Sequence, residues 1–270
     1  RSEDGLAAVR DAGFDAVQAD VTDADSLSAV PDVDAAVFAA SSGGRGADAA
    51  REVYVEGLRT AIDHFGGREH APERFVYTSS TGVYGDHDGD WVDEETPLDP
   101  TTEKTEVLVE AERVTRERAP EFGMGPTVVR FAGLYGPDRY RLTRYLDGPV
   151  TEGYLNMVHR EDAAGVVRFA LTDDAAADSE VLLAVDDEPV SKWDFADWLA
   201  DEAGVEHPEK HTVEERLEAG DLSEPAERRL RTSKRCSNDR LRELGYEFAY
   251  PTFREGYRAA IDAFRRGEYK

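Results

Sequence analysis

Four consecutive hydroxyl side chains follow a short apolar run near residue 80. The apolar residues 75–77 are typical of a buried strand, and Thr78, Ser79, Ser80 and Thr81 come directly after them. In open α/β sheets, ligands bind outside the carboxyl ends of the strands. Hydroxyl groups at such a place can hydrogen-bond a substrate oxygen or a cofactor. We therefore expect a ligand site at residues 75–85.

The elements needed to position these hydroxyls are strands that alternate with helices. Apolar runs predict the strands, and apolar residues at helical spacing predict the helices. The alternation indicates an α/β fold with a doubly wound, Rossmann-like parallel sheet. The expected strands are 14–20, 34–40, 74–79, 127–131 and 180–185, and the expected helices are 2–12, 46–65, 102–118 and 161–171.

The composition is strongly acidic, with 58 Asp and Glu against 32 Lys and Arg and a formal net charge of -26. This balance is typical of a halophilic protein from a high-salt cytoplasm, although an ordinary acidic protein is the alternative. Nucleic acid is not an expected partner, because phosphate binding needs a basic face. No apolar run reaches about 18 residues and no signal peptide is visible, so we expect no membrane partner and a cytoplasmic location.

Seven short motifs occur in the order found in one family of enzymes. Together they resemble the extended short-chain dehydrogenase/reductases of the NAD-dependent epimerase/dehydratase kind. The resemblance covers nearly the whole chain. The motifs are Asp20-Val21, Phe38-Ala39-Ala40-Ser41, Val55-Glu56-Gly57, residues 79–85, residues 130–137, residues 159–162 and residues 237–246.

The resemblance implies a bound NAD or NADP and a division of the chain into domains. Residues 1–137, completed by 159–186, would form the dinucleotide-binding domain, and 138–158 with 187–270 a small C-terminal substrate lobe. Arg1 would lie at the adenosine ribose, which favours NADP, although a solvated terminal Arg is the alternative. The implied cofactor contacts are Arg1, Asp20, Val21, Ala39, Ala40, Ser41, Thr78, Ser79, Phe131 and Gly133.

The chain departs from the family at its beginning. The family starts with a strand and a Gly-x-x-Gly-x-x-Gly loop, whose backbone approaches the pyrophosphate. Here the first residues resemble the end of the second strand. We therefore expect the natural protein to be longer at its N-terminus. The 270 residues alone would bind a dinucleotide poorly and expose a sheet edge.

The second departure concerns the family's Tyr-x-x-x-Lys pair, in which Lys lowers the pKa of the Tyr that transfers the substrate proton. If Lys104 takes the Lys position, Pro100 takes the Tyr position. If residues 110–112 set the register, Lys104 replaces the Tyr and Leu108 the Lys. Neither register restores the pair, so the chain resembles the atypical members of the family.

Three residues are the candidates for catalysis that the resemblance implies. Ser80 would hydrogen-bond the reacting oxygen, and Tyr84 or Lys104 would assist proton transfer. The alternatives are a strand-end cap for Ser80, a core position for Tyr84 and a solvated helix start for Lys104. His159 and Asp162 are expected to be a structural pair at a helix start.

The function implied is an NAD(P)-dependent oxidoreductase or epimerase/dehydratase-like enzyme acting on a small polar or sugar-type substrate. The alternative is a catalytically inactive NADP(H)-binding sensor or protein-interaction module. A monomer or homodimer is expected. No metal is expected, because the acidic residues 86–90 lack the ligand spacing of a calcium loop.

Overall fold

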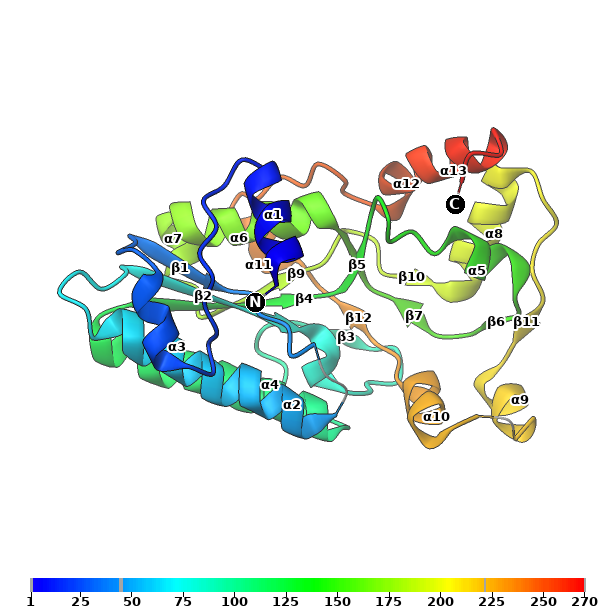
Figure 1. The fold of residues 1–270 in the computed structure, drawn as a ribbon. Coiled ribbons are helices and arrows are strands. Elements are labelled where there is room, and N and C mark those ends of the chain that lie inside the picture. The colour runs from blue at the N-terminus through cyan, green and yellow to red at the C-terminus, as the bar shows by residue number, and fades with distance from the viewer. Residues whose placement is uncertain (1, 44–45, 221, 270) are drawn as a thin grey trace. The chain divides into compact units, whose positions relative to one another are not determined.

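The computed structural model describes residues 2–43, 46–220 and 222–269 (Figure 1). The chain forms two compact units, each assembled from three stretches of sequence. The hydroxyl cluster is divided between the units after Ser79. The first unit takes Arg1–Ser79, Thr102–Val129 and Ala170–Val181, and the second takes Ser80–Thr101, Arg130–Phe169 and Leu182–Lys270. The domain boundaries expected from the sequence stay a prediction.

A four-stranded sheet has the order β1-β2-β4-β9. Its neighbouring strands run parallel, and Phe38 on β1 lies opposite Tyr77 on β2. An α/β fold with a central parallel sheet is therefore confirmed. The strands are β1 (Ala35–Phe38), β2 (Arg74–Ser80), β4 (Gly125–Phe131) and β9 (Val181–Ala184).

The first-unit helices that lie between β1 and β4 in the sequence pack their apolar residues against β1, β2 and β4. One continuous helical stretch follows β1 and includes a π-helical segment, η2. It covers the range expected from the sequence. The helices are α1 (Glu3–Asp11), η1 (Ala24–Ala29), α2 (Ala47–Arg51), η2 (Glu52–Gly57), α3 (Leu58–Gly66), α4 (Glu103–Arg118), η4 (Ala119–Phe122) and α7 (Asp174–Ala177).

Local sequence explains where α4 begins and which side it buries. Thr102 and Thr105 form a reciprocal capping box, in which each side chain bonds the other residue's backbone N–H. Val107, Ala111 and Val114 then recur at helical spacing and are buried. The expected helix at 102–118 is thereby confirmed to within one residue.

The strand expected at residues 14–20 is not formed, and that prediction was wrong. These residues carry apolar side chains but make no ladder with any described strand. A strand needs a neighbour for its backbone N–H and C=O groups, and apolar composition alone does not supply one. Phe14 is 70% exposed and Val37 on β1 is 42% exposed. β1 has β2 as its one described neighbour, so it lies at an edge of the described sheet.

The second unit is built from short elements around an aromatic core. Rings of Tyr135, Phe195, Phe253 and Tyr257 contact one another there. Four two-stranded pairs, β5–β8, β3–β12, β6–β11 and β7–β10, supply its strands.

The strands of the second unit are two or three residues long. They are β3 (Trp91–Val92), β5 (Gly133–Tyr135), β6 (Val150–Thr151), β7 (Tyr154–Leu155), β8 (Met157–His159), β10 (Val190–Ser191), β11 (Lys210–His211) and β12 (Arg235–Cys236). Its helices are η3 (Thr81–Tyr84), α5 (Leu142–Asp147), α6 (Arg160–Thr172, which ends in the first unit), α8 (Lys192–Ala203), α9 (Val213–Glu218), α10 (Glu224–Arg231), α11 (Asp239–Glu243), α12 (Phe253–Gly256) and α13 (Arg258–Arg265).

Candidate cofactor and substrate site

The carboxyl ends of β1 and β2 lie side by side in the first unit, because the two strands are parallel and in register. The residues that follow β1, namely Ala39, Ala40 and Ser41, are exposed. Thr78 on β2 donates its hydroxyl to the Phe38 carbonyl at 3.4 Å. This end of the sheet is therefore open at β1, and Thr78 links the two strands.

The Ser79 hydroxyl is hydrogen-bonded to a buried carboxylate. Its hydroxyl donates to Oε1 of Glu112 at 2.6 Å, and the two residues are 7% and 2% exposed. A hydrogen bond to a charged acceptor is stronger than one between neutral groups. The bond fastens α4 to the end of β2, so we assign Ser79 a positioning role.

Ser80 caps the helix that follows it. Its Oγ accepts the backbone N–H of Gly82 at 3.1 Å, which makes it the N-cap of η3. This is the structural role that the sequence left open. Among the described residues no acceptor takes the hydroxyl proton of Ser80, so that proton is available to a ligand oxygen.

Tyr84 is buried and both functions of its hydroxyl are used. The oxygen accepts a hydrogen bond from Nη1 of Arg130 at 2.6 Å, and the O–H donates to the Asp93 carbonyl at 2.6 Å. Burial raises the pKa of Tyr84, despite the opposing effect of Arg130. The geometry therefore favours a structural role for Tyr84, and its part in proton transfer stays a prediction.

Lys104 lies in the first turn of α4 and is exposed. It belongs to the first unit, whereas Ser80 and Tyr84 belong to the second. Within its own unit it lies near Tyr54 of η2, whose pKa it helps to lower. Whether Lys104 acts with Ser80 or Tyr84 stays a prediction.

Sequence reasoning missed Tyr54. Its hydroxyl accepts the backbone N–H of Ser42 at 3.3 Å, at the open end of β1. The one available signal is its place directly before Val55-Glu56-Gly57, in the helix that follows β1. A hydroxyl at that position reaches back to the strand end because the helix packs beside it.

The predicted adenine contact, Asp20, lies in a local turn next to a cavity. Its Oδ1 accepts the backbone N–H of Thr22 at 3.0 Å and the Thr22 hydroxyl at 2.8 Å. The cavity has a volume of about 400 Å³ and is lined by Gln18, Ala19, Asp20 and Ser26. Space for a ligand group thus exists beside Asp20, and its contact with adenine stays a prediction.

Val21 explains why residue 57 is a glycine. A Cβ built on Gly57 would lie 2.7 Å from Cγ2 of Val21, closer than real Cβ contacts. The φ of Gly57 is -65°, so the requirement is close approach and not backbone conformation. The Val-x-Gly motif therefore lets the helix after β1 approach the segment that carries Asp20.

The remaining predicted cofactor residues fall elsewhere. Phe131 ends β4 and Gly133 begins β5, where its N–H donates to the Asn156 carbonyl at 2.9 Å. Both belong to the second unit. Arg1 lies outside the described residues, so the structure gives no account of its predicted ribose contact.

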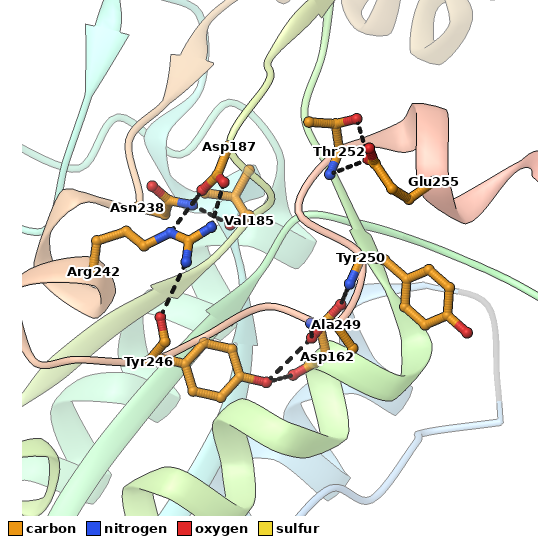
Figure 2. Close-up of polar contacts among 10 residues, drawn as sticks. All are labelled: Asp162, Val185, Asp187, Asn238, Arg242, Tyr246, Ala249, Tyr250, Thr252 and Glu255. Atoms are coloured by element: carbon orange, nitrogen blue, oxygen red, sulfur yellow. Dashed lines mark hydrogen bonds and ion pairs between the residues drawn. The ribbon is translucent and has the colours of Figure 1, made fainter.

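His159 and Asp162 have the structural roles expected of them. Nδ1 of His159 accepts the backbone N–H of Glu161 at 3.3 Å, and burial lowers the pKa of the imidazole. Figure 2 shows Asp162 accepting the backbone N–H groups of Ala249 at 2.8 Å and Tyr250 at 2.9 Å. These bonds fasten the segment at residues 249–250 to α6.

A second polar network holds α11. Nδ2 of Asn238 donates to the Val185 carbonyl at 3.1 Å and to Oδ1 of Asp187 at 2.7 Å (Figure 2). Arg242 forms an ion pair with the same Asp187 carboxylate. The motif at residues 237–246 thus secures the chain after β9.

Within residues 2–43, 46–220 and 222–269, no group of three or more His, Cys, Asp or Glu side chains could hold a metal ion. Over the same ranges, no helix combines the length and apolar character needed to cross a membrane.

Comparison with known proteins identifies the class of the chain. A family model described as NAD(P)H-binding matches residues 1–174. The fold and this match define a nucleotide-binding protein with a Rossmann-like sheet. The chain belongs to this NAD(P)H-binding family, and the resemblance to extended short-chain dehydrogenases is confirmed.

Several individual proteins are similar to the chain. YeeZ of Escherichia coli K12 is 33% identical over 177 residues, which are 63% of this chain and 62% of YeeZ. The match thus spans less than two thirds of that curated relative.

Solved structures extend the similarity to the second unit. A candidate NAD-dependent epimerase/dehydratase of Methylobacillus flagellatus is 28% identical, with a TM-score of 0.72 over 94% of this chain and 85% of that one. DesIV, a dTDP-glucose 4,6-dehydratase of Streptomyces venezuelae solved with NAD bound, is 22% identical with a TM-score of 0.74. It covers 100% of this chain and 86% of its own, and it shares the fold.

Proposed function

We propose that this chain is an NAD(P)-dependent oxidoreductase of the epimerase/dehydratase kind that acts on a small polar or sugar-type substrate. The observation that carries the proposal is the match to the NAD(P)H-binding family across residues 1–174, the range that includes the open end of β1 and the hydroxyls after β2. When bound, the cofactor supplies hydride chemistry. NADP is favoured only by Arg1, so we propose it as the finer assignment.

Ser80 is the residue proposed to hold the reacting substrate oxygen. Its Oγ is fixed by the N–H of Gly82, which leaves the O–H to donate to a carbonyl or hydroxyl oxygen. A donor fixed before the substrate arrives stabilises the charge that develops on that oxygen during reaction. The supporting neighbours, Ser79 and Glu112, hold the preceding residue in place.

In the first part of the test, a fluorescence titration measures the binding of NADPH and of NADH. Turnover is then measured with a panel of aldehydes, ketones and sugar nucleotides. We expect Ser80→Ala to lower turnover by about 100-fold or more, the usual effect of losing one such donor. Ser237→Ala is the matched control, because Ser237 Oγ also accepts the N–H two residues later, from Asp239 at 3.0 Å.

Equal losses in the two variants would remove Ser80 from the mechanism. Absence of binding to either cofactor would contradict the proposed function itself.

One observation favours a second function, that of an NADP(H)-binding sensor without turnover. Along α4, positions 104 and 108 hold Lys and Leu, so the helix carries no Tyr-x-x-x-Lys pair. Tight NADPH binding with no hydride exchange across the panel would support the sensor. Turnover with any member of the panel would exclude it.

A further inference from the structure

Tyr54 of η2, Tyr77 of β2 and Tyr84 of η3 differ in the surroundings of their hydroxyls. The hydroxyl of Tyr84 is held by two hydrogen bonds. The hydroxyl of Tyr77 is buried and has no hydrogen-bond partner among the described residues. Tyr54 is partly exposed and its hydroxyl lies at the open end of β1. Only Tyr54 combines access with a polar setting.

The position of Tyr54 is fixed by contacts on both sides. Its oxygen accepts the N–H of Ser42 at 3.3 Å, in the loop that leaves β1. The helical stretch before it is joined to α4 by an ion pair between Arg51 and Glu110, at 2.5 Å. That ion pair holds the segment of Tyr54 beside α4, whose first turn contains Lys104.

We propose that Tyr54 is the proton donor and acceptor of this chain, and that the charge of Lys104 supports it. The inference rests on the proposed function and names a further residue of that site. The pair comes from two separate elements, η2 and α4, so no local sequence spacing marks it.

In carbonyl reduction, a bound reduced nicotinamide would supply the hydride that forms the new C–H bond at the substrate carbon, and the nicotinamide would be left oxidised. The π-electron pair of the carbonyl moves to its oxygen, which takes the phenolic proton of Tyr54. The Tyr54 phenolate that remains is stabilised by the Ser42 N–H and the Lys104 ammonium, and water reprotonates it. In the oxidative direction the phenolate would take the proton of a substrate hydroxyl while an oxidised nicotinamide accepted the hydride from the carbon, which would become a carbonyl carbon.

The electrostatics of the three tyrosines agree with this assignment. Burial alone would raise the pKa of Tyr54, but hydrogen bonds from Ser42 and Ser41 and the charge of Lys104 lower it below its usual range. Burial raises the pKa of both Tyr77 and Tyr84. A lowered pKa brings a tyrosine closer to the pH at which it can exchange a proton.

A titration tests the pair without any substrate. The groups that face Tyr54 are Lys104 from α4, Tyr77 from β2 and the two serines after β1. Phenolate absorbance of the full chain is followed against pH, and the curve for Tyr54→Phe is subtracted to isolate Tyr54. We expect a midpoint below about 10, the ordinary value. Lys104→Met should raise this midpoint and Lys104→Arg should restore it.

Turnover by the NADPH-loaded protein tests the catalytic role. We expect Tyr54→Phe to lower kcat by about 100- to 10,000-fold, the range for general acid–base groups, with NADPH affinity close to that of the parent chain. Tyr269→Phe is the control, because it removes the same atom from a tyrosine outside the expected ligand site, whose hydroxyl donates to the Tyr140 carbonyl at 3.0 Å. It should leave kcat unchanged.

The outcomes separate this inference from the proposed function. The pair would be overturned if Tyr54 titrated with an ordinary midpoint that Lys104→Met did not change. Full turnover by Tyr54→Phe would overturn it too. Loss of NADPH binding in the parent chain would instead overturn the proposed function. If the parent chain binds NADPH but turns over no substrate, the titration alone tests the pair. A lowered midpoint for Tyr54 then supports the pair, and an ordinary midpoint refutes it.

Discussion

Replacing Asp162 tests how strongly the end of the chain is held to α6. The Asp162 carboxylate is 2% exposed and accepts two backbone N–H groups, from Ala249 at 2.8 Å and Tyr250 at 2.9 Å (Figure 2). The Tyr246 hydroxyl lies 3.4 Å from it. Asp162 also places a negative charge in the first turn of α6. Both effects favour the folded state.

The expected loss follows from these contacts. A hydrogen bond to a charged acceptor contributes about 1.5–3 kcal/mol to stability. Asp162→Ala removes two such bonds, so we expect the free energy of unfolding to fall by about 3–6 kcal/mol. The lost helix-terminus charge adds about 0.5 kcal/mol. Asp162→Asn keeps one acceptor but turns an amide N–H toward a donor, so about half of the loss should remain.

Urea unfolding at high KCl, followed by tryptophan fluorescence, measures these free energies. Asp239→Ala is the control, because Asp239 is also an acidic residue in the first turn of a helix but is exposed. Its effect should stay within about 0.5 kcal/mol. If Asp162→Ala fell within the same range, the two backbone contacts would not hold the chain end, and the reasoning would fail.

Three further perturbations have clear expected outcomes. Gly57→Ala should lower the free energy of unfolding by about 1–3 kcal/mol, because its Cβ would strike Val21, and Val21→Ala should recover part of that loss in the double variant. Burial raises the pKa of the Cys236 thiol to about 11, above its unfolded value of about 8.5. Its contribution to stability is therefore complete below about pH 8.5 and is lost as pH rises through about 11. Cys236→Ala should flatten that decline in an unfolding series, and an unchanged pH dependence would count against the assignment. Since the net charge is -26, the midpoint of thermal unfolding should rise as KCl is increased from about 0.1 to about 1 M, and a midpoint that fell with salt would contradict the halophile interpretation.

The sequence predicted those elements whose signals are local. Thr102 and the helical spacing from Val107 to Val114 located α4, and the apolar residues 75–77 located β2. Residues 14–20 also carry apolar side chains, yet no strand forms there. The difference is that a helix satisfies its own backbone, whereas a strand depends on a neighbour that composition cannot reveal.

The sequence predicted the position of the candidate site better than the roles of its residues. Ser79 lies 33 residues from Glu112, and Tyr84 lies 46 residues from Arg130. Nothing in the sequence around either hydroxyl shows that a distant side chain will take it. Tyr54 was missed for the same reason, since its neighbour Lys104 is 50 residues away along the chain.

Hydroxyl groups mark a site by their number, but their chemistry depends on which protons remain uncommitted. Thr78 donates to a backbone carbonyl and Ser79 donates to a buried carboxylate, so the protons of both serve the fold. Ser80 accepts at its oxygen and keeps its proton. Tyr54 also accepts at its oxygen, from Ser42, and for this hydroxyl the hydrogen bonds favour the phenolate. An oxygen that is held only as an acceptor is fixed in position and can still donate to a substrate. Of Thr78, Ser79 and Ser80, it is therefore Ser80 whose proton stays uncommitted, and our proposal adds Tyr54 of the first unit, from a helix that the hydroxyl pattern did not include.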